Sequence, residues 1–310
     1  MAIHFLSDSN GGEGRGLALI AGESGAGKTY FAHALAADPQ YAPVLSLSFD
    51  KSFNSIWPRQ KYAKMLAAEF NGEVPDIQLD VVPIDDIATL ADILNGLASR
   101  TLRYKPTGQP FKTVVLDNIT RMQQKHLLQL KGETIIGFEP ERPDYGKSQN
   151  AIIALLTLIQ DKCPVEFLAT CEIRGEKPTK RVQMEADGLT PQMGLDGQPI
   201  LDKADPESTI GYRLGLSSTV GSMVPGFFAI TGRLYIGPRR VRIFDARPNL
   251  YFRIAKDSPG AVVGVRPPIL SRDAKPKRVE GVLFNGTMLD IVDQLREQNS
   301  EQATIESNVS

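Results

Sequence analysis

Cysteine and histidine are scarce in this chain of 310 residues. The two cysteines, Cys163 and Cys171, lie in apolar surroundings, which excludes a disulfide framework and fits a reduced, cytoplasmic compartment. The three histidines, at positions 4, 33 and 126, are scattered along the chain. Because neither residue type shows the spacing of metal ligands, the sequence predicts no zinc site.

Long apolar runs and an excess of one charge are also missing. No stretch approaches the roughly 20 apolar residues of a membrane span, and the first residues lack the basic segment and apolar run of a signal peptide. Against 36 Asp and Glu stand 35 Lys and Arg, so the formal net charge is -1. We therefore expect no membrane partner, and any contact with nucleic acid has to come from a local basic loop.

One glycine-rich stretch, residues 22–29, dominates what is present. It reads GESGAGKT and fits the Walker A or P-loop pattern G-x-x-x-x-G-K-[ST]. The apolar run 17–21 before it predicts a buried strand, and the Ala-rich run 30–37 after it predicts a helix that ends before Pro39. The motif thus lies between a strand and a helix, where a phosphate-binding loop belongs; a glycine-rich turn without a ligand is the alternative.

The residue types of this loop suit a nucleoside triphosphate. Glycines let backbone N–H groups surround the phosphates, and a helix N-terminus adds partial positive charge. We expect Lys28 to reach the β- and γ-phosphates and the Thr29 hydroxyl to ligate Mg²⁺. The predicted cofactors are ATP and Mg²⁺, and the predicted nucleotide-binding residues are Gly22, Glu23, Ser24, Gly25, Ala26, Gly27, Lys28, Thr29 and Tyr30.

Strand and helix patterns alternate as far as residue 170, which predicts a mainly parallel α/β sheet between two layers of helices. After residue 171 the chain becomes polar, and β-rich runs then predict an antiparallel extension of this sheet. The strands are expected at 17–21, 44–49, 79–82, 113–117, 165–170, 227–236, 239–244 and 250–255, and the helices at 30–37, 58–72, 87–97, 119–132, 146–162 and 287–298.

Three regions follow from these patterns. We expect an N-terminal arm at 1–16, an ATPase core at 17–256, and a C-terminal region at 257–310. That last region begins with a loop rich in proline and glycine up to residue 282, and it ends in a polar, disordered tail after the short helix.

Two predicted strands end in carboxylates. Asp117 closes an apolar run and is expected to be the Walker B acid, on a strand beside the P-loop strand, where it holds Mg²⁺. Asn118 follows it, whereas many AAA+ and helicase-type ATPases place a catalytic glutamate there, so that arrangement is disfavoured. We therefore expect Asp50, at the end of the second strand, to orient the attacking water; a helix cap or turn residue is the alternative.

The strand at 165–170 ends in Thr170, Cys171 and Glu172. Residues at this position commonly sense the γ-phosphate, and packing in the core is the alternative. The arginines at 239, 240 and 242 lie on a predicted strand, and we interpret them as the protective charges of an edge strand; a basic face formed by the alternation of the strand is the alternative.

The order of these features resembles that of RecA-like ATPases encoded by phages, of the single-strand annealing and recombination type. It runs from the Walker A motif through the acid-ended strands, a Pro-Asp-Tyr-Gly segment at 143–146 and the sensor strand to hairpins that end in Ala-Lys-Asp at 255–257. RecA relatives usually carry glutamate where this chain has Asp50, which concerns the rate of hydrolysis more than nucleotide binding. The likeness covers roughly residues 15–260.

This resemblance implies a homo-oligomeric ATPase that acts on single-stranded DNA in phage recombination or replication. It implies a location in the host cytoplasm and a single-stranded DNA-binding protein as a further partner. In such proteins the loop after the sensor strand holds DNA, which here points to Arg174, Lys177, Lys180 and Arg181. An ordinary solvated loop is the alternative for these four cations.

Lys256 closes the last hairpin, where RecA relatives carry a basic residue that reaches the γ-phosphate bound by the neighbouring subunit. A local salt bridge with Asp257 or Asp245 is the alternative. Two other functions also stay open: a small-molecule or nucleoside kinase with residues 174–181 as its lid, and a non-catalytic nucleotide-binding scaffold.

Overall fold

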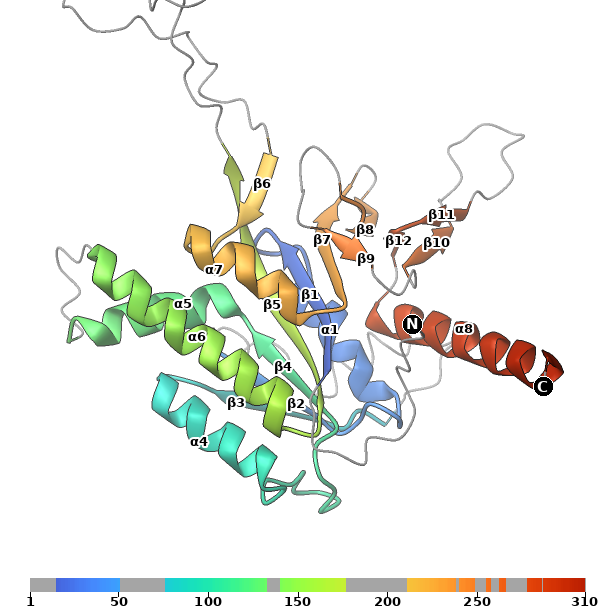
Figure 1. Cartoon of the computed structure of the whole chain (residues 1–310), viewed down its shortest axis with the longest axis horizontal. Helices are drawn as coiled ribbons and strands as arrows, with labels where there is room; N and C mark the ends of the chain where they lie inside the picture. The colour runs from blue at the N-terminus through green and yellow to red at the C-terminus, as the bar shows by residue number, and fades with distance from the viewer. Residues whose placement is uncertain are drawn as a thin grey trace, which may run out of the picture.

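A mostly parallel β-sheet forms the centre of the protein, and helices cover both of its faces (Figure 1). The computed structural model describes residues 15–50, 76–132, 140–176, 211–237, 240–248, 255–257, 262–265, 278–285 and 287–309. The helix expected at 58–72 and three of the cations expected to bind DNA, Lys177, Lys180 and Arg181, lie outside these residues. Among the described helices, none is both long and apolar enough to cross a membrane.

Six of the described strands run parallel, in the order β7-β1-β5-β4-β2-β3. Their bounds are Arg15–Gly22 for β1, Val44–Ser48 for β2, Leu79–Pro83 for β3, Thr113–Asp117 for β4, Glu166–Glu176 for β5 and Ile230–Ile236 for β7. Both β2 and β4 are buried along their whole length, as expected where helices cover both faces of a parallel sheet. The predicted α/β sheet is confirmed.

Alternating side chains of the central strands enter two separate hydrophobic cores. In β1, Leu19 and Ala21 join the core under α4, α5, α6 and α7, whereas Ala18 and Ile20 join the core under α1 and α8. The helices are α1 (Lys28–His33), α4 (Ile87–Ala98), α5 (Ile119–Leu130), α6 (Arg142–Lys162), α7 (Ser218–Met223) and α8 (Met288–Val309), with 3-10 turns η1 (Ala34–Ala37) and η2 (Val224–Phe227).

Capping side chains explain where the central helices begin. Asp86 caps α4 and Asn118 caps α5, each through an oxygen that accepts from the backbone N–H three residues later. Glu141 and Asp144 form a capping box, so α6 begins before its predicted start at residue 146.

The strands after α7 differ from the prediction in direction and position. β7 pairs parallel with β1, so it belongs to the parallel sheet and does not open the antiparallel extension. That extension begins one strand later, where β8 (Arg242–Asp245) pairs with β7 on one side and with β12 (Val282–Phe284) on the other. β8 is therefore an interior strand, and the prediction that Arg242 protects an edge is wrong. Arg240 precedes the strand, and Arg239 lies outside the described residues.

Two regions expected to be loops also contribute strands. β5 continues to Glu176, and β6 (Gly211–Leu214) pairs antiparallel with its end. Within the loop expected up to residue 282, β10 (Val263–Val265) pairs with β11 (Arg278–Glu280) and extends the sheet beyond β12. The hydrogen-bonding partners of these short strands are distant in sequence, so local patterns do not reveal them.

Both ends of the described chain are more ordered than expected. β1 begins at Arg15, inside the expected arm, and α8 continues through the tail that was expected to be disordered. Ile291 and Val292 of α8 are fully buried in the core that includes Phe31 of α1. The C-terminal helix therefore packs directly behind the helix that follows the glycine-rich loop.

Gly16 tests the close packing at the start of β1. A Cβ added there would lie 1.6 Å from the carbonyl oxygen of Phe227, and backbone atoms yield little. We expect Gly16→Ala to lower the free energy of unfolding by about 3 kcal/mol, measured by urea denaturation. Gly226→Ala is the matched control, because an added Cβ there meets nothing within 4 Å. Equal stability of the two variants would contradict the described packing.

Candidate functional site

The carboxyl ends of β1, β5 and β4 form the edge at which the glycine-rich loop lies. The loop runs from Gly22 to α1, and Gly25 and Gly27 adopt φ angles of 78° and 88°. These left-handed conformations are strained for residues with a side chain, so the two glycines shape the loop. The strand, loop and helix that the P-loop pattern requires are all present.

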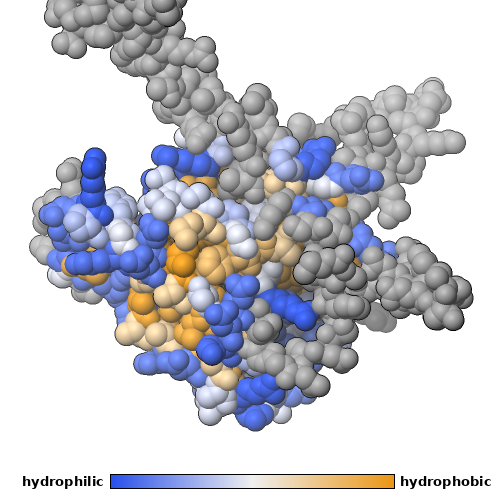
Figure 2. Space-filling model, viewed as in Figure 1, coloured by the Kyte–Doolittle hydropathy of each residue, from blue (hydrophilic) through white to orange (hydrophobic). Residues whose placement is uncertain are grey.

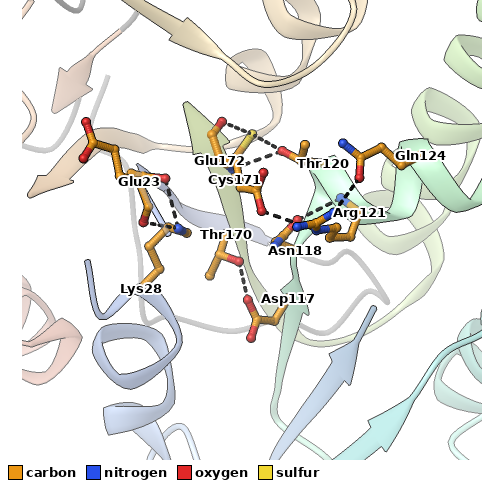
Figure 3. Close-up of polar contacts among 11 residues, drawn as sticks. Glu23, Lys28, Asp117, Asn118, Thr120, Arg121, Gln124, Thr170, Cys171 and Glu172 are labelled. Carbon is orange, nitrogen blue, oxygen red and sulfur yellow. Dashed lines mark hydrogen bonds and ion pairs between the residues drawn. The ribbon is translucent and has the colours of Figure 1, made fainter. Parts of the chain in front are cut away.

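Lys28 folds back over this loop (Figure 3). Its Nζ donates hydrogen bonds to the carbonyl oxygens of Gly22, at 2.9 Å, and Glu23, at 2.7 Å. Burial lowers the pKa of Lys28, and the negative charges of Asp117 and Glu172 oppose that shift. The buried ammonium group of Lys28 is therefore held at the start of the glycine-rich loop, near the carboxylates of Asp117 and Glu172.

Asp117 joins the loop to two strands. Its Oδ2 accepts a hydrogen bond of 2.7 Å from Thr29 Oγ1, and its Oδ1 accepts one of 2.5 Å from Thr170 Oγ1. The sequence suggested that the strand of Asp117 lies beside the P-loop strand. This prediction is wrong, because β5 lies between β1 and β4. This insertion places Thr170 against the carboxylate, while Thr29 still reaches it from α1.

Thr29 and Asp117 fit a magnesium ion by their chemistry. A hydroxyl and a carboxylate are the hard oxygen ligands that Mg²⁺ prefers, and their oxygens already lie next to each other. Within the described residues no group of three His, Cys, Asp or Glu side chains is arranged to hold a metal. A bound ion would therefore need further oxygens from water and from the nucleotide phosphates.

The three residues of the expected sensor position have different surroundings. Thr170 contacts the Walker B acid, as described above. Cys171 is buried, and burial raises the pKa of its thiol to about 11, so it is a protonated core residue. Glu172 lies in register with Gly22 and forms an ion pair of 3.4 Å with Arg121 (Figure 3). Of these three residues, Thr170 is the one that donates a hydrogen bond to Asp117, and its role as a sensor stays a prediction.

Asp50, expected to orient water, follows the end of β2 and is exposed. Its carbonyl oxygen accepts a hydrogen bond of 2.7 Å from Ser48 Oγ. β2 is the neighbour of β4 on the side away from β5, so Asp50 and Glu172 lie on opposite sides of Asp117. Glu172, named above as part of the sensor position, lies level with Gly22 at the start of the loop.

The remaining predicted residues lie at two places. Arg174 is exposed near the end of β5, directly opposite Arg213 of β6. Lys256 lies in β9 (Lys256–Asp257), where its backbone pairs with Thr231 of β7, and its side chain is outside the described part. Its reach toward a neighbouring subunit stays a prediction.

Two arginines near the loop were not predicted. Arg233 of β7 stacks on Tyr212, with its guanidinium carbon 3.6 Å from the ring centre, and lies 3.9 Å from a carboxylate oxygen of Glu23. Arg242 of β8 lies 4.7 Å from the ring centre of Tyr30. The run of arginines was visible in the sequence, but only the pairing of β8 with β7 brings Arg242 to α1.

A family model described as an AAA domain matches residues 17–205, which is more than half of the chain. This chain belongs to the AAA domain family. No curated protein matches it. The AAA domain is of the P-loop ATPase type, and the match includes the glycine-rich loop, Asp50, Asp117 and Thr170. It ends before β6, so Arg213, Arg242 and their strands lie beyond the matched part.

One departure from the common AAA+ arrangement is visible in this AAA domain. Asn118 follows Asp117, and its side-chain oxygen accepts a hydrogen bond of 2.8 Å from the backbone N–H of Arg121. An amide that caps α5 cannot serve as the acid or base of a hydrolysis step. Asn118 therefore does not take the place of the glutamate common in AAA+ ATPases.

Asp117→Asn tests the assignment of the metal-binding carboxylate. The variant removes the charge and keeps the shape, so we expect affinity for ATP to fall about tenfold in Mg²⁺. Affinity measured in EDTA should stay close to that of the parent protein. Asp245→Asn is a less suitable control because its carboxylate pairs with Arg247, so Asp161→Asn, exposed on α6, is preferred. An equal loss with and without Mg²⁺ would show a structural role for Asp117 instead.

Proposed function

We propose that this AAA domain protein is a Mg²⁺-dependent ATPase that acts on single-stranded DNA as a homo-oligomer. The observation that carries the ATPase part is the contact of Asp117 with both Thr29 and Thr170 beside the glycine-rich loop. The setting of phage recombination or replication, the host cytoplasm and a single-stranded DNA-binding protein as partner rest on the resemblance in motif order alone.

Hydrolysis of ATP depends on positioned charges rather than on covalent chemistry. Lys28 supplies a cation for the β- and γ-phosphates, and Thr29 with Asp117 would hold Mg²⁺, which would neutralise charge on the phosphates. Thr170 orients the Asp117 carboxylate from its other side. We assign the attacking water to Asp50, which follows the end of β2, the strand beside β4 with its terminal Asp117.

A basic groove supports the DNA part of the proposal. It lies between α5, the start of α6, the paired ends of β5 and β6, and the start of α7, and its volume is about 870 Å³. Arg142, Arg174 and Arg213 line it, and no Asp or Glu is among the lining residues that the structure describes. Tyr145, which is 38% exposed, also lines it and offers an aromatic ring to an unstacked base.

The two strand arginines of this groove point to an anionic ligand. Arg174 and Arg213 are directly opposite each other in the antiparallel pair, a position where like charges destabilise a sheet. In the described part of the chain neither forms an ion pair with a carboxylate. A phosphate bound between them would relieve this repulsion, and a DNA backbone supplies phosphates at regular spacing.

The kinase alternative is less consistent with this arrangement. A kinase lid has to move, whereas Arg174 lies in the hydrogen-bonded ladder between β5 and β6. The ladder suits a fixed binding surface better than a lid.

An apolar area supports assembly into an oligomer. Figure 2 shows hydrophobic residues gathered on the face that α6 and α7 cover, with hydrophilic residues around them. Met223 of α7 is 42% exposed. Apolar areas of this kind commonly mark protein–protein contacts. A neighbouring subunit would also bring the bound γ-phosphate that Lys256 is predicted to reach.

ATP turnover with and without single-stranded DNA tests the proposed function. We expect slow turnover alone, stimulation by a single-stranded oligonucleotide, and loss of both in Lys28→Ala, which lacks the phosphate-binding cation. A kinase would instead need an acceptor and ignore DNA, and a scaffold would bind ATP without turnover. Turnover in Lys28→Ala at the parent rate would rule out the glycine-rich loop as the active site.

Charge removal in the groove tests the DNA contact. With Arg174→Gln and Arg213→Gln together, two phosphate contacts are lost, so the slope of log affinity against log salt should flatten by about 1.4. Fluorescence anisotropy of a labelled oligonucleotide across a salt series measures this slope. Arg100→Gln with Lys105→Gln is the control, because both are exposed near the C-terminal end of α4, away from the groove. Unchanged affinity and slope in the groove variant would exclude the groove as a main contact.

A further inference from the structure

Arg242 approaches the glycine-rich loop from the side opposite Asp117. In the sheet, β8 is two strands from β1 on one side, and β4, which carries Asp117, is two strands from β1 on the other. The pairing places Gly22 level with Leu234, and Ile236 opposite Arg242. Arg242 therefore lies beyond the carboxyl end of β1, where the loop is.

The side chain of Arg242 reaches the start of α1. Its guanidinium lies over the ring of Tyr30, 4.7 Å from the ring centre, and a Cβ added to Gly27 would lie 3.7 Å from its Nε. Tyr30 directly follows Thr29, and Gly27 directly precedes Lys28. The guanidinium thus borders the loop at the residues that surround the nucleotide phosphates.

This guanidinium is held firmly but its charge is not neutralised. The backbone N–H of Arg242 donates a hydrogen bond of 2.9 Å to Asn285 Oδ1. The backbone carbonyl of Arg242 accepts one of 2.7 Å from the backbone N–H of Asn285, so the main chain that carries the guanidinium is fixed. Nη1 is buried and, within the described part of the chain, has no hydrogen-bond partner. No ion pair with a described carboxylate is present either. A buried N–H of a cation without a partner is costly, which makes a bound anion the natural complement.

We propose that Arg242 binds the nucleotide in cis, on the side of the α-phosphate and the nucleoside. The metal ligands Thr29 and Asp117 mark the other side of the loop as that of the γ-phosphate. The opposite side, where Arg242 lies, is left for the α-phosphate and ribose. The Tyr30 ring holds the planar guanidinium by cation–π stacking, so its N–H groups are already oriented.

This inference rests on the proposed nucleotide binding and extends it to a residue outside the matched AAA domain. It also assigns a different task to each cation of the loop. Lys28 acts on the β- and γ-phosphates, which only a triphosphate presents in full. Arg242 acts on the part that ATP and ADP share, so it contributes equally to both.

Binding of ATP and ADP to the full chain, measured by calorimetry, tests this division. We expect Arg242→Gln to weaken ATP and ADP alike, by about ten- to a hundredfold, because a charge-assisted contact is lost. Arg242→Lys should recover only part of the affinity, since lysine keeps the charge but lacks the stacked, planar donors. Arg240→Gln is the matched control, an exposed arginine of the same run.

The outcomes separate this inference from the proposed function. If the parent protein binds ADP and Arg242→Gln binds it equally well, Arg242 is only a structural brace and the inference is wrong. A loss confined to ATP would place Arg242 at the γ-phosphate and would also overturn it. If the parent protein binds neither nucleotide, the proposed function fails first. The unfolding temperatures of the parent protein and of Arg242→Gln are also compared without nucleotide. A large fall for Arg242→Gln together with unchanged ADP affinity would likewise indicate a purely structural role for Arg242.

Discussion

The carboxylate of Asp117 is the point on which the candidate site depends. It ends the buried strand β4, accepts hydrogen bonds from Thr29 of α1 and Thr170 of β5, and so ties three segments of the chain together. A carboxylate that is 7% exposed is stable there because hydroxyl donors occupy both of its oxygens. Any change in the position of α1, β4 or β5 would alter these two contacts.

The order of the strands explains how charge is distributed around the loop. Strands on one side of β1 supply acids and hydroxyls, whereas β7 and β8 on the other side supply Arg233 and Arg242. Lys28 lies between them, with its pKa lowered by burial and opposed by the nearby carboxylates. A nucleotide with a metal ion at one end and bare phosphate oxygens along its length has a complementary distribution of charge.

Core packing keeps this edge of the sheet in place. Phe244, which follows Arg242 on β8, stacks on Phe31 of α1 with ring centres 4.9 Å apart, and α8 packs behind the same helix. His33, at the end of α1, is buried, and burial lowers its pKa to about 4, so its neutral ring can share a hydrogen bond of 2.8 Å with Ser46. These contacts fix the helix that carries the loop relative to β2 and β8.

Local patterns in the sequence were sufficient for the loop, the strands up to β5 and the carboxylate that ends β4, because each depends on residues close together in the chain. They could not show that β7 is parallel to β1, that β5 separates β1 from β4, or that Arg213 and Arg242 reach a groove and a loop. Strand order and register are set by hydrogen bonds and packing between distant segments, and a change of one residue in register turns a side chain to the other face. The sequence by itself thus determined that the chemical groups of a P-loop are present in this chain. Only the tertiary structure decided which arginines lie next to that loop, because the strands that carry them are distant from it in sequence.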